Sequence, residues 1–307
     1  MSCPAPIVEA PATAGHASAC GPILWATMAV GDLDSSVAAH AAGLGYAVRT
    51  QGRIGADLAG LWGAPEVAGA RWALIGPPGH GPGALRLIET GAEAAAPLAS
   101  LGWAAAELSV ADADARLTTA TDAGFRLLGP ARQLGSNPAI RAGQLADRWG
   151  GALYLTDVRG HDGRLDLHRA EHDVDRCFIA VLASADLEAD RSWFEAAGIG
   201  RRISDRRLAV PVLQRCLGLA EDAETRISSL QLGGGCLIEI DAYPADTPPR
   251  RTARGLPAGV ALISLAAPAV ATGWTAIPAP PYHGARIRVD RLPGGALLER
   301  VAAEGGA

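Results

Sequence analysis

The stretch Ile23–Gly45, ILWATMAVGDLDSSVAAHAAGLG, decides the fold, because a strand-like run changes into a helix within it. Residues 23–30 are uncharged and, apart from Thr27, apolar, as expected of a strand that is buried on both faces. Asp32 is a good N-cap, and the helix that follows it is expected to stop at Gly45. The folded part of the chain therefore begins with a strand followed by a helix.

The same pattern returns at Cys177–Gly200, CFIAVLASADLEADRSWFEAAGIG, where Asp186 takes the place of Asp32. The two aspartates are 154 positions apart, and Arg86 in ALRLIET and Glu239 in CLIEIDA are 153 positions apart. Two pairs of markers separated by nearly the same number of residues indicate an internal repeat. Further strands and turns after each copy predict four βαβββ modules, of which the last is the most degraded.

Length and composition favour two globular domains, since the chain has 307 residues of which 49% are hydrophobic. Residues 1–22 contain four prolines among small residues and are expected to form a flexible arm. An N-terminal domain is expected at 23–160 and a C-terminal domain at 174–301. Residues 161–173 between them, rich in Asp, Arg and His, are expected to form a solvated linker.

Composition also excludes several classes of function. All 27 basic residues are Arg, so Schiff-base enzymes, pyridoxal phosphate linkages and Walker A loops are excluded. The net charge of −5 argues against a nucleic-acid partner, and the cluster Arg201, Arg202, Arg206 and Arg207 is expected to be a solvated turn. Prolines interrupt the uncharged segment Gly255–Tyr282, so no membrane span is expected. Five scattered cysteines indicate reduced thiols and a cytoplasmic location.

The segments DLDSSVAAHAAGLG and DLEADRSWFEAAG, together with GALRLIET, GALYLTD and GALLERV, resemble the motifs of the vicinal oxygen chelate superfamily. This superfamily includes glyoxalase I, bleomycin resistance proteins and extradiol dioxygenases, and the resemblance covers about 23–301. It implies an α+β, glyoxalase-like fold in which four βαβββ modules pair into two open β-cups. We expect one cup in each half of the chain, each made of two neighbouring modules.

Metal-dependent members of the superfamily hold a divalent ion through His, Gln or Glu on the first and last strands of their modules. In the first half, the matching positions are Trp25, Arg86, Ala105 and Tyr154, so the first cup is expected to hold no metal. In the second half, only Glu239 and Glu299 match. One of them could be a protonated acid or base, both could hold an unidentified divalent metal with water or His283, or each could be a structural residue.

Other candidate site residues follow from the same alignment. Arg86 would either bind a carboxylate or enolate oxygen of a substrate or form an internal ion pair with Glu107. Tyr154 and Trp25 would supply an aromatic wall to the same cup. With Glu239 and Glu299, we therefore take Arg86 and Tyr154 as catalytic candidates, and Trp25, Glu107, Tyr243 and His283 as substrate contacts.

The resemblance implies a small-molecule enzyme, a lyase, isomerase or related activity, acting on an aromatic or oxygenated organic acid-like substrate. The alternative is a non-catalytic protein that sequesters a hydrophobic or aromatic compound. A typical extradiol dioxygenase is disfavoured, because no His stands at the matching positions. Inward-facing charges favour the enzyme, since a cup kept only for packing would replace them with apolar residues. The expected partner is a small-molecule ligand, and a homodimer is left open.

Overall fold

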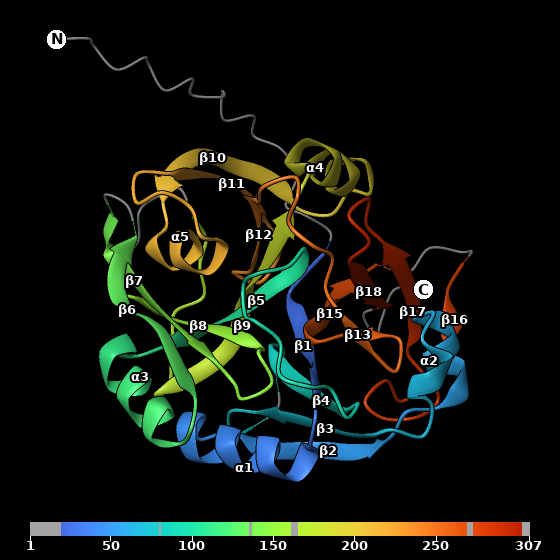
Figure 1. Ribbon diagram of the computed structural model, residues 1–307. Helices are drawn as coiled ribbons and strands as arrows, with labels where there is room; N and C mark the ends of the chain where they lie inside the picture. Colours follow the sequence, from blue (N-terminus) through green and yellow to red (C-terminus); the bar gives the residue numbers. More distant parts are fainter. Residues whose placement is uncertain (1–19, 80, 135–136, 161–164, 269–272, 303–307) are drawn as a thin grey trace, which may run out of the picture.

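The computed structural model describes residues 20–79, 81–134, 137–160, 165–268 and 273–302. Most of the predicted N-terminal arm and the first four linker residues, 161–164, lie outside them. Three complete βαβββ modules and a fourth, partial one follow one another along the chain, as the repeat predicts (Figure 1).

The first two modules have full sets of elements. The first contains β1 (Ile23–Val30), α1 (Leu33–Leu44), β2 (Ala47–Arg53), β3 (Arg71–Gly76) and β4 (Ala84–Glu89), with α2 (Ala56–Leu61) and a 3-10 turn (Pro65–Val67) between β2 and β3. The second contains β5 (Gly102–Val110), α3 (Ala113–Asp122), β6 (Arg126–Leu134), β7 (Asn137–Ala146) and β8 (Ala152–Val158).

The third module matches the first closely, whereas the fourth is reduced. The third contains β9 (Val174–Ser184), α4 (Leu187–Ala196), β10 (Arg201–Ala209), α5 (Pro211–Leu217), β11 (Glu224–Gln231) and β12 (Leu237–Ala242). After the short strands β13 (Thr252–Ala253) and β14 (Leu256–Pro257), the fourth contains β15 (Gly259–Ala267), β16 (Thr275–Ala276), β17 (Arg286–Arg291) and β18 (Leu297–Ala302). Its described residues include no helix, in agreement with its predicted degradation.

An aspartate N-cap starts the long helix of each complete module. The carboxylates of Asp32, Asp112 and Asp186 accept hydrogen bonds from the backbone N–H groups three residues later, at 2.8, 3.0 and 3.0 Å. Each satisfies a donor that the first helical turn leaves unpaired. Gly45 ends α1 with φ of 69°, a conformation that glycine adopts without steric cost.

The strands form two curled eight-stranded sheets, and their order corrects the expected pairing of modules. The first sheet has the order β16-β17-β18-β15-β1-β4-β3-β2, and the second has the order β10-β11-β12-β9-β5-β8-β7-β6. Strand β1 pairs with β15, and β5 pairs with β9, both antiparallel. The first module thus shares a sheet with the fourth, and the second with the third. The prediction that modules one and two share one cup and modules three and four share the other is wrong, because the module pattern specifies each unit but not which first strands meet.

We call the sheet of modules one and four the outer cup and the sheet of modules two and three the inner cup. Figure 1 shows α5 within the curl of the inner cup and α2 at the open side of the outer cup. Inside the outer cup, Leu58 of α2 packs with Trp25, Trp62, Trp72 and Tyr282 in a core of its own. A second, larger core contains residues of both sheets, including the inside of the inner cup, and of α1, α3, α4 and α5. No described helix is long and apolar enough to cross a membrane.

Candidate functional site

The outer cup contains a buried ion pair between Arg86 of β4 and Glu299 of β18, whose Nη2 and Oε1 atoms are 3.5 Å apart. Neither residue is exposed to solvent. The Arg86 Nε group donates to Thr27 Oγ1 at 2.9 Å, and Nη1 donates to the Tyr282 hydroxyl at 2.5 Å. The internal partner of Arg86 is therefore Glu299 and not Glu107, which lies in the other sheet.

The Glu299 carboxylate is stabilised by three neutral donors in addition to Arg86. Ser264 donates its hydroxyl to Oε1 at 2.7 Å, while Trp62 Nε1 and the Tyr282 hydroxyl donate to Oε2 at 3.0 and 2.8 Å. Tyr282 thus accepts from Arg86 and donates to Glu299, and burial holds its pKa well above the usual value. The Glu299 carboxylate is therefore engaged within the protein by three hydrogen bonds and an ion pair.

Aromatic rings surround the same guanidinium. Its central carbon lies 5.4 Å from the ring centre of Trp25, 4.8 Å from that of Trp62 and 5.8 Å from that of Tyr282. These separations are within the range of cation–π attraction. The Trp25 ring packs edge-on against Tyr282, with ring centres 5.6 Å apart, in the core that also contains Trp62. Tyr154, the partner expected from the sequence, lies in the other sheet.

The inner cup contains a different set of charges. Glu107 of β5 lies in register with Tyr154 of β8, and Glu239 of β12 lies in register with Val181 of β9. Since Val181 is in turn paired with Ala105, two residues before Glu107, these side chains share one face of the sheet. Asp241, two residues after Glu239, lies on that face as well. Three carboxyl groups and a tyrosine therefore line one side of the inner cup.

Burial and mutual repulsion control the protonation of these carboxyl groups. Burial, followed by the charge of Glu239, raises the pKa of Glu107 to about 8, although a hydrogen bond from the Thr156 hydroxyl opposes the shift. Burial likewise raises the pKa of Asp241, with Glu239 and Glu107 adding to it. Burial also raises the pKa of Glu239, and nearby Arg206 partly lowers it. With a pKa of about 8, Glu107 holds its proton at neutral pH.

Exposure distinguishes the three carboxyl groups. Glu107 and Asp241 are 3% and 2% exposed, whereas Glu239 is partly exposed. Asp241 Oδ1 and the hydroxyl of the next tyrosine, Tyr243, have no hydrogen-bond partner among the described residues. The inner cup therefore contains polar atoms with unused hydrogen-bonding capacity and one partly exposed glutamate.

The structure separates several residues that the sequence alignment placed together. Glu239 and Glu299 lie in different sheets, and so do Arg86 and Tyr154, so neither expected catalytic pair is formed. His283 is exposed beside Tyr282, with φ of 49°, and takes no part in the hydrogen bonds of Glu299.

Sequence reasoning missed Trp62, Tyr282 and Asp241. Asp241 could have been found from strand alternation, because it stands two residues after Glu239 in CLIEIDA. Trp62 and Tyr282 lie outside the repeated strands, in segments whose position only the fold determines.

Neither cup fits the divalent ion that the resemblance implies for metal-dependent members. In the outer cup a guanidinium, itself a cation, occupies the matching position. In the inner cup the matching positions offer carboxyl and phenol groups but no imidazole, a poor set for Zn or Fe. No group of three or more His, Cys, Asp or Glu side chains in the described ranges could hold a metal ion.

Two curled sheets built from βαβββ modules form a glyoxalase-like fold. Solved structures agree: glyoxalase I from Zea mays is 15% identical, with 91% of this chain and 92% of that chain covered and a TM-score of 0.58. A "putative dioxygenase" from Bacillus subtilis is 16% identical, with 92% and 86% covered and a TM-score of 0.55. Neither the family models nor the curated proteins gave a match. At these identities the likeness shows the fold alone.

Proposed function

We propose that the chain is a small-molecule enzyme that carries out proton transfer on an oxygenated organic acid in the inner cup. The observation that carries the proposal is the set of three carboxyl groups, Glu107, Glu239 and Asp241, on one face of the second sheet. Carboxyl groups with raised pKa values can give and take protons near neutral pH. In the outer cup, by contrast, Glu299 is occupied by Arg86 and three neutral donors.

The exposure of these groups supports distinct roles. Glu239 is the acid or base that meets the substrate, because it is the partly exposed residue of the set. Glu107 and Asp241 are more deeply buried, and each interacts electrostatically with Glu239, so the protonation of one group affects that of the others. Arg206 on β10 is exposed and close enough to lower the pKa of Glu239, so it is suited to pair with a substrate carboxylate.

Hydrogen exchange tests the proposal on a panel of candidate acids. Solutions of 2-oxo acids, 2-hydroxy acids and aromatic acids are incubated with the protein in D₂O, and loss of C–H signals is followed by proton NMR. We expect at least one compound to exchange, and Glu239→Gln to slow that exchange by about 100-fold or more. Glu224→Gln, an exposed substitution on β11 of the same sheet, is the matched control and should exchange at the wild-type rate.

The same variants separate the enzyme from a sequestering protein. If a panel compound binds to the wild type and to Glu239→Gln equally well and neither exchanges its protons, the chain is a binding protein without turnover. If Glu239→Gln exchanges as fast as the wild type, Glu239 is not the acid or base, and the assigned roles are wrong.

A further inference from the structure

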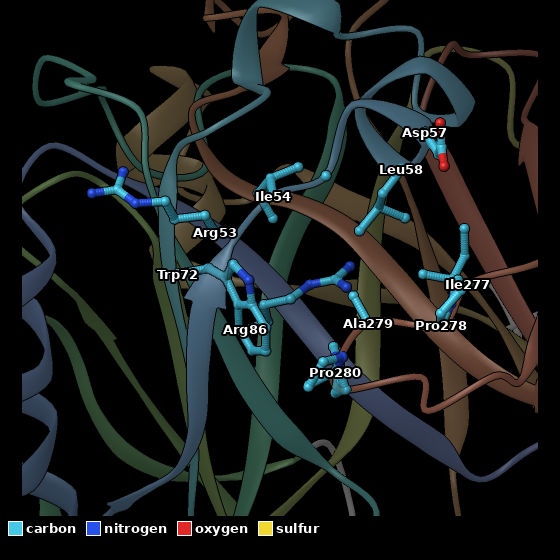
Figure 2. A pocket seen from close by; sticks show the side chains of 12 residues that line it. Arg53, Ile54, Asp57, Leu58, Trp72, Arg86, Ile277, Pro278, Ala279 and Pro280 are labelled. Atoms are coloured by element: carbon cyan, nitrogen blue, oxygen red, sulfur yellow. The ribbon is translucent and has the colours of Figure 1, made fainter.

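A small cavity lies beside Arg86 in the outer cup, separate from the carboxyl groups of the inner cup. Its volume is about 80 Å³. Ile54, Leu58 and Trp72 give it apolar walls, and residues 277–281 close the other side. Figure 2 shows the Arg86 side chain running into this pocket, with its guanidinium ending between Leu58 and Ala279. The cavity therefore has one charged end and otherwise mainly apolar walls.

The guanidinium has more donors than the protein supplies acceptors. Of its five N–H groups, one on Nε bonds to Thr27 and one on Nη1 bonds to Tyr282. Nη2 is buried and makes no hydrogen bond to any described residue. Its closest approach to Glu299, 3.5 Å, belongs to an ion pair without hydrogen-bond geometry.

Glu299 does not supply the missing acceptor in this structure. Its two oxygens already accept three hydrogen bonds, from Ser264, Trp62 and Tyr282. Buried donors without acceptors are costly, and this cost is larger for a charged group. An acceptor supplied from outside the chain would remove it.

The shape and chemistry of the cavity narrow the class of that acceptor. A guanidinium edge presents parallel N–H groups, which match the two oxygens of a carboxylate. The volume is about half of the roughly 150 Å³ that an apolar cavity needs to take benzene, so about three or four heavy atoms fit. Two exposed residues of opposite charge, Arg53 and Asp57, also line the pocket, and the Arg53 guanidinium is directed away from Arg86 (Figure 2).

We propose that this pocket binds a one- or two-carbon monocarboxylate, of the formate or acetate class, through the free N–H groups of Arg86, with any methyl group against Leu58 and Trp72. The proposal is independent of the function assigned to the inner cup. The competing occupant is water alone, which could also accept from the guanidinium.

Ligand-observed NMR on the full chain tests this inference with acetate as the probe. We expect saturation transfer to acetate with a dissociation constant on the order of 1 mM, because a ligand of four heavy atoms can gain little more. Benzoate is too large for the cavity, so it should give no saturation-transfer signal that added acetate reduces. Absence of acetate binding up to about 100 times that concentration would leave water as the occupant and overturn the proposal.

Three variants locate the binding. Leu58→Phe fills the cavity without removing a partner of Arg86, and we expect it to weaken acetate binding at least tenfold. Leu61→Phe, on the same helix but not among the cavity-lining residues, is the matched control and should bind like the wild type. Arg86→Met should abolish binding if it folds. Equal acetate binding by Leu58→Phe and Leu61→Phe would place the site elsewhere, while the proton exchange assigned to Glu239 should be unchanged in all folded variants.

Discussion

Replacing Glu107 with Gln should remove a loss of stability that the wild type suffers as the pH rises. Burial raises the pKa of Glu107 from 4.5 to about 8, so the folded chain holds this proton more tightly than the unfolded chain does. The contribution of Glu107 to stability is therefore full below pH 4.5 and is lost as the pH rises to 8. At about 1.4 kcal/mol for each pH unit, the loss amounts to roughly 5 kcal/mol. Gln stays neutral and can still accept the hydrogen bond from Thr156.

The measurement is the free energy of unfolding in urea at several pH values between 4.5 and 9. The variant should match the wild type near pH 4.5 and exceed its stability progressively, by up to about 5 kcal/mol, as the pH approaches 8. Comparing the two proteins cancels the contributions of titrating groups that do not interact with Glu107. Glu93→Gln, an exposed substitution, is the control and should follow the wild-type curve. Parallel curves for Glu107→Gln and the wild type would refute the assignment of a buried, protonated Glu107.

Three further predictions concern stability. Glu299→Gln should lower the free energy of unfolding by about 3–5 kcal/mol, because it leaves the buried charge of Arg86 uncompensated. The double variant with Arg86→Met should lose less stability than the sum of the two single variants. A double-mutant cycle measured by urea unfolding checks this. Burial lowers the pKa of His40 from 6.5 to about 4. The contribution of neutral His40 to stability is therefore full above pH 6.5 and is lost as the pH falls to 4. In urea titrations, His40→Leu should remove about 3 kcal/mol of the stability loss that the wild type shows over this range. Asp186→Ala should cost about 0.5–2 kcal/mol by removing the N-cap of α4, with thermal unfolding as the measurement and no change as the contradicting result.

Local features of the fold could be predicted from the sequence, because short-range rules determine them. Asp32 and Asp186 cap helices where the pattern placed the caps, and the apolar segment after Gly255 forms short strands instead of a membrane span. The cluster around Arg206 is exposed, as predicted, but lies on the edge strand β10 rather than in a turn. An alternating strand with charges on its solvent side has the same composition as a polar turn.

The candidate sites depended on long-range pairing that local patterns do not contain. Arg86 and Glu299 are 213 positions apart, and only the pairing of β1 with β15 brings their sheet positions together. The sequence alignment assigned Arg86 the position of a ligand in a cup and Glu299 the position of a carboxylate in another. Both residues do lie on the strands to which they were assigned, but the structure joins them in one network of hydrogen bonds and an ion pair within a single cup.

The nested order of the modules has a consequence for how the chain folds during synthesis. The inner cup is built from one continuous segment, Gly102–Ala242, and all its strands are available once that segment has emerged. Strands β1 to β4 must wait for β15, which begins roughly 170 residues after β4 ends. At typical synthesis rates this delay is roughly 10–30 s, during which the edge of β1 remains unpaired. Contacts between such distant segments also slow folding, so closure of the outer cup is expected to be the late step, and truncation near the C-terminus should expose β1 to aggregation.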